Sequence, residues 1–227
     1  MKYVLLWDID GTLLTTARAG IFAWEDACRK VLGVSADLTN LHTAGLTDVE
    51  IAVKLAELNG ARPEPPVILR LLQIYETALP SCLPLKTGAV LPGVRKLLDY
   101  LKRQDDIFSM LLTGNTAAGA KAKLSYYGLN GYFTHGAFAE IGLDRPMIAR
   151  KAVEIAKNIL KNSFSASGLY VIGDTPHDIN CGKAIGARTV AVASSVYSAE
   201  ELLEHNPWWA VERLPEPDVF VEKIRGK

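Results

Sequence analysis

Short apolar runs alternate with longer segments of helical periodicity along the chain. The apolar runs occupy residues 3–9, 107–113, 168–174 and 187–193. Continuous apolar runs of this length are typical of strands that are covered on both faces, because a strand with one solvated face shows alternating polar residues instead. The pattern therefore predicts an α/β fold whose core is a mainly parallel, Rossmann-like sheet.

Helical patterns fill the intervals between the later apolar runs. They cover residues 92–103, 115–128 and 144–161. The last segment, residues 206–224, predicts one more strand followed by one more helix. This order is the one that β-α-β units of a parallel sheet require.

The interval between the first two apolar runs is too long for one β-α-β unit. It extends from residue 10 to residue 106, whereas a complete unit needs only about thirty residues. The interval is itself helical, since Ile21, Trp24, Cys28 and Val31 fall on one face of a helix. An insertion therefore separates the first strand from the second.

Two further helices are expected within this insertion. Thr47 and Glu50 form a capping-box signature at the start of one of them. The other follows a proline-rich turn at residues 63–66. We therefore expect residues 16–86 to form a small α-helical cap domain.

The remaining residues are expected to form the core. It would consist of residues 1–15 and 87–227, with linkers to the cap near Thr15 and at residues 86–90. Both linkers leave the core close to the end of the first strand. The cap is therefore expected to lie above that end.

The charge balance narrows the class of partner. Lys plus Arg is 25 and Asp plus Glu is 25, so no overall positive field favours nucleic acid or an anionic membrane. We expect a small-molecule partner, no nucleic acid and no membrane. The oligomeric state stays open.

The cysteines and the apolar segments indicate the compartment. Cys28, Cys82 and Cys181 are far apart and form no metal-binding pattern, so we expect reduced core thiols rather than a disulfide framework. The N-terminal apolar run is too short for a signal sequence, and no later run approaches the length of a membrane span. The predicted location is the cytoplasm.

Acidic and hydroxyl side chains follow several of the predicted strands. Asp8 and Asp10 come after the first strand, Thr113 ends the second, and Asp174 follows the third. In an open parallel sheet, ligands bind at the edge formed by the carboxyl ends of the strands. We therefore expect these residues to meet at one site.

Carboxylates that are crowded together repel one another and require protons or a metal ion. Hard oxygen ligands at an open site favour Mg²⁺ over Zn²⁺. Gly11 permits a tight turn after the strand, while Thr12 and Thr113 can donate to phosphate oxygens. A carboxylate at such a site can also attack phosphorus.

These motifs resemble those of the haloacid dehalogenase-like superfamily. Residues 8–12 match its D-x-D-x-T loop, Thr113 its hydroxyl residue, and residues 173–178 its G-D-x-x-x-D loop. The segments "LPGV" (91–94) and "AGLTD" (44–48) are similar to those of its phosphoglycolate phosphatase-like and phosphoglucomutase-like members with a helical cap. The likeness extends over nearly the whole chain.

The resemblance implies a role for each aspartate. Asp8 would be the nucleophile that forms an aspartyl-phosphate, and Asp10 the general acid and base. Mg²⁺ would be held by Asp8, the backbone carbonyl of Asp10, Asp174 and, directly or through water, Asp178. An aspartate at position 10 favours phosphoryl transfer, because members that remove halogens or cleave phosphonates lack it.

The resemblance also implies the residues that hold the substrate phosphate. Thr113 would bind the phosphate through its hydroxyl. The other expected substrate-binding residues are Gly11, Thr12, Gly114 and Asn115.

The third motif departs from the family pattern. Relatives usually have Lys-Pro at the start of the helix before the acidic strand, and this chain has Arg145-Pro146. Arg145 is therefore the first choice for the catalytic cation, since guanidinium binds phosphate bidentately. Lys123 and Lys151 remain alternatives, and a solvated helix face would explain either lysine as well. For His177 a loop or capping role is favoured over metal binding.

The predicted function is that of a Mg²⁺-dependent phosphatase for a small phosphorylated metabolite. A β-phosphoglucomutase-like phosphomutase and a catalytically silent binding protein remain alternatives. The natural substrate stays open. The cap residues considered for its selection are Arg18, His42, Thr43, Thr47, Asp48 and Lys54.

Overall fold

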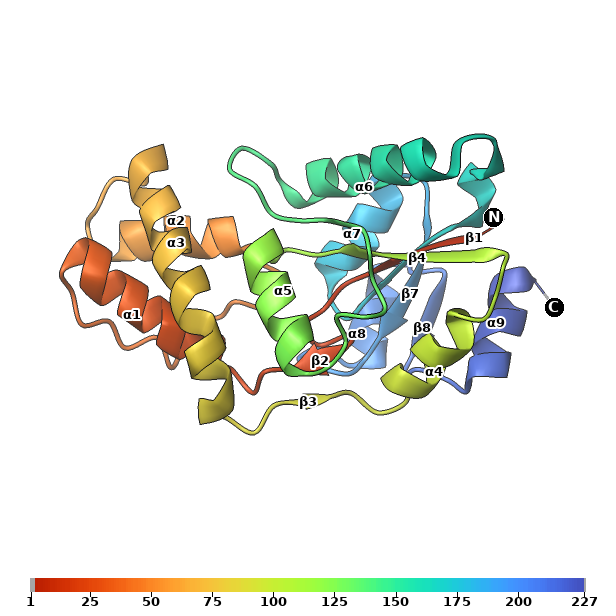
Figure 1. The fold of residues 1–227 in the computed structure, drawn as a ribbon, viewed down its shortest axis with the longest axis horizontal. Helices are drawn as coiled ribbons and strands as arrows, with labels where there is room; N and C mark the ends of the chain where they lie inside the picture. Colours follow the sequence, from red (N-terminus) through yellow and green to blue (C-terminus); the bar gives the residue numbers. More distant parts are fainter. Residues whose placement is uncertain (1–2, 227) are drawn as a thin grey trace.

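The computed structural model describes residues 3–226, and within this range a six-stranded sheet with parallel pairing throughout forms the core (Figure 1). Its strands are β1 (Tyr3–Trp7), β4 (Ile107–Leu112), β5 (Gly136–Ala137), β6 (Leu169–Gly173), β7 (Arg188–Val192) and β8 (Trp209–Val211). The order across the sheet is β5-β4-β1-β6-β7-β8. The prediction of an α/β fold with a parallel sheet is confirmed.

Four strands coincide with the predicted apolar runs, and β8 with the predicted final strand. Every residue of β1 and of β6 is buried, which agrees with strands covered on both faces. The apolar pattern does not predict β5. This strand has only two residues, and its pairing with the end of β4 defines it.

Helices cover both faces of the sheet (Figure 1). The core helices are α4 (Val94–Leu101), α5 (Ala117–Tyr126), α6 (Arg145–Leu160), α7 (Pro176–Ala184), α8 (Ala199–Glu204) and α9 (Pro217–Arg225), with short 3₁₀ turns at Lys161–Ser163 and Ala166–Gly168. α6 packs against α7, and α4 packs against α9. Phe220 of α9 stacks on Trp7 of β1 with ring centroids 6.0 Å apart. Full burial of such a ring contributes about 1.5–3 kcal/mol.

The insertion forms a separate group of helices at the end of the core where β1 stops (Figure 1). It contains α1 (Gly20–Leu32), α2 (Asp48–Leu58), α3 (Pro65–Cys82) and a 3₁₀ turn, Leu83–Leu85. α1 packs on α3, and the rings of Trp24 and Tyr75 stack with centroids 4.0 Å apart. The predicted capping box at the start of α2 is present, with Thr47 and Glu50 bonded in both directions.

Two short strands join the insertion to the core. They are β2 (Leu14–Thr15) and β3 (Ala89–Val90), which pair antiparallel. The pairing holds the two linkers side by side, so both enter the insertion at one point. We therefore propose the cap boundaries that the sequence predicts, residues 16–86.

The cysteines agree with the prediction of core thiols. Cys28, Cys82 and Cys181 are all buried and free. None of the helices within residues 3–226 has both the length and the apolar character that crossing a membrane requires.

Candidate active site

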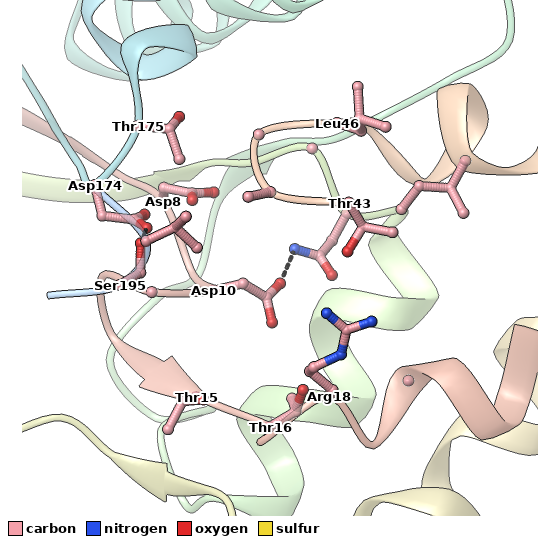
Figure 2. A pocket seen from close by; sticks show the side chains of 18 of the residues that line it. Asp8, Asp10, Thr15, Thr16, Arg18, Thr43, Leu46, Asp174, Thr175 and Ser195 are labelled. Carbon is pink, nitrogen blue, oxygen red and sulfur yellow. Dashed lines mark hydrogen bonds between the residues drawn. The ribbon is translucent and has the colours of Figure 1, made fainter. Parts of the chain in front are cut away.

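Three carboxylates meet beyond the carboxyl ends of two neighbouring strands. Asp8 follows β1, Asp174 follows β6, and Asp178 lies in the first turn of α7. β1 and β6 pair directly, so Asp8 and Asp174 leave the same edge of the sheet (Figure 2). One oxygen of each carboxylate lies within 4.8 Å of the other two, and all three residues are buried. Three of the four sequence-predicted acids, Asp8, Asp174 and Asp178, are thus brought together.

The loop after β1 is built around Asp174. The hydroxyl of Thr12 donates to one Asp174 oxygen at 3.0 Å, and the hydroxyl of Ser195 donates to the other. Gly11 has a positive φ of 80°, and a Cβ at this position would overlap the Asp174 carboxylate. Both the backbone conformation and the space therefore require glycine at position 11.

Asp178 is fixed by α7 and by a buried arginine. The backbone N–H and the hydroxyl of Thr175 donate to one of its oxygens at 3.1 and 2.7 Å. Nη1 of Arg145, the first residue of α6, donates to the other oxygen at 3.0 Å. Nε of Arg145 donates to the backbone carbonyl of Gly45 in the cap at 2.9 Å. Arg145 therefore connects the acidic cluster with the cap.

Burial and mutual repulsion disfavour the ionised forms of these acids. Burial, and then the charge of Asp178, raise the pKa of Asp8 well above its ordinary value, while Arg145 opposes this shift. Burial and Asp178 also raise the pKa of Asp174 to about 7, although Ser195 and Thr12 donate hydrogen bonds to it. A divalent cation would relieve this repulsion, so the donor set fits a hard metal ion.

The side chain of Asp10 points away from this cluster (Figure 2). Its Oδ2 accepts hydrogen bonds from Nδ2 of Asn115 at 2.8 Å and from Nζ of Lys123 at 2.6 Å. Nζ of Lys123 also donates to Oδ1 of Asn115 at 2.5 Å. Asp10 therefore has a cation of its own, distinct from the arginine bound to Asp178.

The two alternative lysines have different environments. Lys123 is only 6% exposed, so a solvated helix face does not describe it. Burial alone would lower the pKa of Lys123, but Asp10 and Asp48 outweigh it and raise the pKa. Lys151 is bonded to Glu140 and is partly exposed, outside the group of residues around Asp8.

Thr113 stands at the end of β4 and is buried. Its hydroxyl oxygen accepts a hydrogen bond from Nδ2 of Asn115 at 2.8 Å, and its backbone N–H donates to the carbonyl of Ala137. Gly114 faces the cap, and a Cβ there would lie 3.1 Å from the carbonyl oxygen of Leu46. The 113–115 loop thus lies between β4, Asp10 and the cap.

A cavity of about 420 Å³ lies above these residues, between cap and core (Figure 2). Asp8, Asp10, Asp174, Arg145 and Lys123 all line it. Among the cap residues considered for substrate selection, the lining includes Arg18, His42, Thr43 and Asp48. Thr47 instead caps α2, and Lys54 is not part of the described lining.

Two serines complete the site, and the sequence analysis does not identify them. Ser194 and Ser195 lie just beyond β7, after Ala193, and Ser194 donates to the carbonyl of Gly11. The rule that selected the aspartates, a polar residue just after a buried strand, also applies to this pair. His177 packs against Gly45, whose Cβ would overlap its ring, and lies outside the carboxylate group. His177 lies in the first turn of α7 and not in a loop, and Thr175 and Asp178 form the capping box of that helix, so its predicted role is corrected to a packing contact with the cap.

Comparison with known proteins agrees with this geometry. The model of the haloacid dehalogenase-like hydrolase family matches residues 5–192. The chain is 25% identical over 221 residues to the probable phosphatase IndB of Dickeya dadantii (strain 3937), covering 95% of this chain and 92% of IndB.

Solved structures have the same fold. CbbY from Rhodobacter sphaeroides, in complex with phosphate, superposes with a TM-score of 0.75 at 17% identity, covering 94% of this chain and 95% of CbbY. A proposed beta-phosphoglucomutase from Thermotoga maritima gives a TM-score of 0.62 at 21% identity, with coverage of 98% and 99%. The family match covers most of the chain and includes the end of β1 and all of β4, β6 and β7. The chain therefore belongs to the haloacid dehalogenase-like hydrolase family.

Proposed function

We propose that this protein is a Mg²⁺-dependent phosphatase that hydrolyses a small phosphomonoester through an aspartyl-phosphate on Asp8. One observation carries the proposal: Asp8, Asp174 and Asp178 form a buried carboxylate cluster beneath the cavity between cap and core. The relationship to IndB, a probable phosphatase, supports this activity. The buried free cysteines support the predicted cytoplasmic location.

Asp8, Asp174 and Asp178 are the side chains proposed to hold Mg²⁺, because their oxygens lie within 4.8 Å of one another. The Asp10 carboxylate is not part of this group, and its backbone carbonyl stays the predicted fourth ligand. Bound Mg²⁺ would neutralise the carboxylates and stabilise charge on the phosphoryl oxygens. Arg145 would add positive charge on the same side of the site.

The first chemical step would transfer the phosphoryl group to Asp8. A carboxylate oxygen of Asp8 attacks phosphorus while the bond from phosphorus to the leaving oxygen breaks. The protonated carboxyl of Asp10 gives its proton to the leaving oxygen, which departs as an alcohol. Among the described residues, the hydrogen bonds to this carboxyl come from Asn115 and Lys123 and go to Oδ2. Oδ1 is the oxygen proposed to carry the proton.

The second step would release phosphate. Water attacks the phosphorus of the aspartyl-phosphate, the bond between phosphorus and the Asp8 oxygen breaks, and Asp10 accepts the proton of the water. Both aspartates return to their starting states. The cavity walls contributed by the cap would limit the access of bulk water during the first step.

A phosphomutase is the second candidate, and the likeness to the proposed Thermotoga maritima beta-phosphoglucomutase favours it. In that case a sugar hydroxyl, instead of water, would accept the phosphoryl group from Asp8. Isomerisation of a sugar phosphate that depends on a bisphosphate activator would identify this reaction. Phosphate release without isomerisation would identify the phosphatase.

A panel of phosphomonoesters, assayed for released phosphate with and without Mg²⁺, tests the proposal. We expect Mg²⁺-dependent release by the wild type and none by Asp8→Asn. Asp105→Asn is a matched control, because Asp105 is exposed in the turn before β4, at the opposite edge of the sheet. Activity that survives Asp8→Asn would refute the nucleophile assignment. Inactivity of the wild type on every ester would support the silent binding protein.

A further inference from the structure

Asp48, the first residue of α2, joins the cap to the active-site loop after β4 by two hydrogen bonds. Its backbone N–H donates to the carbonyl of Gly114 at 2.7 Å, and its Oδ2 accepts from the backbone N–H of Thr116 at 2.8 Å. These two peptide groups flank Asn115. A single cap residue therefore holds Asn115 from both sides.

The fit around the Asp48 carboxylate is close. Asp48 is 5% exposed, and its carboxylate lies at the N-terminus of α5, where free N–H groups favour negative charge. A Cβ at Gly119 in α5 would lie only 3.2 Å from Oδ2 of Asp48. α5 is also the core helix that packs against α3 of the cap (Figure 1). The carboxylate thus occupies a defined position between cap and core.

Asn115, which Asp48 holds from both sides, is one of the two residues that bind Asp10. Asn115 donates to Oδ2 of Asp10, and Lys123 donates to the same oxygen. Lys123 lies one helical turn beyond Gly119 on α5, and the charges of Asp10 and Asp48 both act on it. Asp48 is therefore linked to Asp10 by two routes, through the peptide groups of Asn115 and through the charge of Lys123.

The same cap segment also contacts the other cation. The carbonyl of Gly45 accepts from Nε of Arg145, and Asp48 follows three residues later. If the cap moves away from the core, both contacts break. Asn115 would then lose the bonds to its flanking peptide groups, and the position of Asp10 would be less restricted.

We propose that Asp48 is a positioning residue that orients Asp10 for proton transfer when the cap lies against the core, by holding the two peptide groups that flank Asn115. The inference rests on the proposed role of Asp10 as general acid. It differs from a purely structural role, in which Asp48 would only attach the cap and would affect every substrate equally.

Aryl phosphates of similar shape separate the two roles. Phenol is a poorer leaving group than 4-nitrophenol, so phenyl phosphate depends more on protonation of the leaving oxygen than 4-nitrophenyl phosphate does. The value of kcat/KM reports the steps through formation of the phosphoenzyme. For Asp48→Ala we expect kcat/KM to fall about tenfold more with phenyl phosphate than with 4-nitrophenyl phosphate. This difference is smaller than the loss of about 10²–10⁴-fold expected when the general acid itself is removed.

Two further variants control the experiment. Asp48→Asn keeps the volume and one acceptor oxygen but loses the charge near Lys123, so we expect a smaller loss with the same preference for phenyl phosphate. Glu50→Ala breaks the capping box of the same helix. Among the described residues, the capping hydrogen bonds of Glu50 are with Thr47 of the cap, and none reaches the core. We expect it to change kcat/KM by the same factor for both esters.

An equal loss for both esters in Asp48→Ala, or no loss, would overturn the inference. If Asp48→Ala does not fold, as judged by thermal unfolding, Asp48→Asn decides by the same criterion. A wild-type protein that hydrolyses neither ester nor any member of the phosphomonoester panel would refute the proposed function instead. The two failures are therefore distinguishable.

Discussion

Asp8 and Asp10 are separated by a single residue in the sequence, yet they occupy different environments. Asp8 is 4% exposed and lies among other acids, and burial raises its pKa. The side chain of Asp10 is 40% exposed and binds Lys123 and Asn115. Side chains two positions apart would share a face in an extended strand, so their different directions reflect the departure of the chain from strand geometry after β1 ends at Trp7. In the proposed mechanism these two residues of one type take different roles, Asp8 as nucleophile with bound Mg²⁺ and Asp10 as general acid.

Each half of the site also has its own cation. Arg145 binds Asp178, whose side chain is 1% exposed, whereas Lys123 binds the more exposed Asp10. A buried charge without a partner cannot recover its hydration, but a partly exposed one can. Loss of Arg145 should therefore affect folding more than loss of Lys123.

The largest expected effects are losses of activity on replacing Asp8 or Asp10, and the two variants should differ in how the loss depends on the leaving group. Asp10→Asn should lower kcat/KM for phenyl phosphate by about 10²–10⁴-fold, and less for 4-nitrophenyl phosphate, because only the poorer leaving group needs the proton. Asp8→Asn should remove activity on both esters. Steady-state kinetics with both esters check this expectation. An equal loss for the two esters in Asp10→Asn would contradict the role of Asp10 as general acid.

The next effect is on stability. Arg145→Met should lower the free energy of unfolding by about 3–5 kcal/mol, because it leaves the buried carboxylate of Asp178 without its partner. Urea unfolding at neutral pH measures this change. Lys151→Met is a suitable control, since Lys151 forms a partly exposed ion pair with Glu140. A similar small change in both variants would show that Asp178 is stabilised by other means.

The acidic cluster should make stability depend on pH and on metal. The pKa of Asp174 is raised from 3.8 to about 7 in the folded protein, so the folded state binds more protons than the unfolded state between these values. Without divalent ions, stability should therefore fall as pH rises from 4 to 7, by on the order of 3 kcal/mol.

Mg²⁺ should reverse much of this loss at pH 7 and above, because in the proposed site it would bind the ionised cluster in the folded state. Thermal unfolding at several pH values, with EDTA or with Mg²⁺, measures both effects. Asp174→Asn should flatten the pH dependence in EDTA. A stability that rises with pH in EDTA would contradict the raised pKa of Asp174 in the folded protein.

The smallest expected effect concerns Lys123. Lys123→Met should lower the free energy of unfolding by only about 1 kcal/mol, because water can rehydrate the partly exposed Asp10. Its activity should fall more with phenyl phosphate than with 4-nitrophenyl phosphate, as Asp10 loses one of its two partners. Urea unfolding and kinetics on the same samples test both expectations. A stability loss as large as that of Arg145→Met would remove the distinction between the two cations.

Local pattern was sufficient to predict most of the fold. Long apolar runs mark β1, β4, β6 and β7, because burial on both faces leaves no polar positions in a strand. The capping box at Thr47 and Glu50 is also a local signal and is present. β5 is not predictable in this way, because two residues carry no periodicity and only the neighbouring β4 makes them a strand.

The candidate site was predictable to a similar degree. The positions of Asp8, Thr113 and Asp174 after apolar runs predict that they meet, and the structure brings them to one edge of the sheet. Ser195 carries the same signal, but a serine is too common to stand out without its contact to Asp174. The contact of Asp48 with Asn115 joins the cap to the core, and no spacing along the chain indicates it.

By itself, the sequence determined the longer strands, the inserted helices and the acidic edge, because these depend on periodicity and on the order of residues along one chain. Only the tertiary structure decided which cation serves which acid. Arg145 binds Asp178 and Lys123 binds Asp10 across separations of 33 and 113 residues. Such pairing depends on the packing of α5 and α6 on the sheet and of the cap on α5. These distances in space have no counterpart in local sequence.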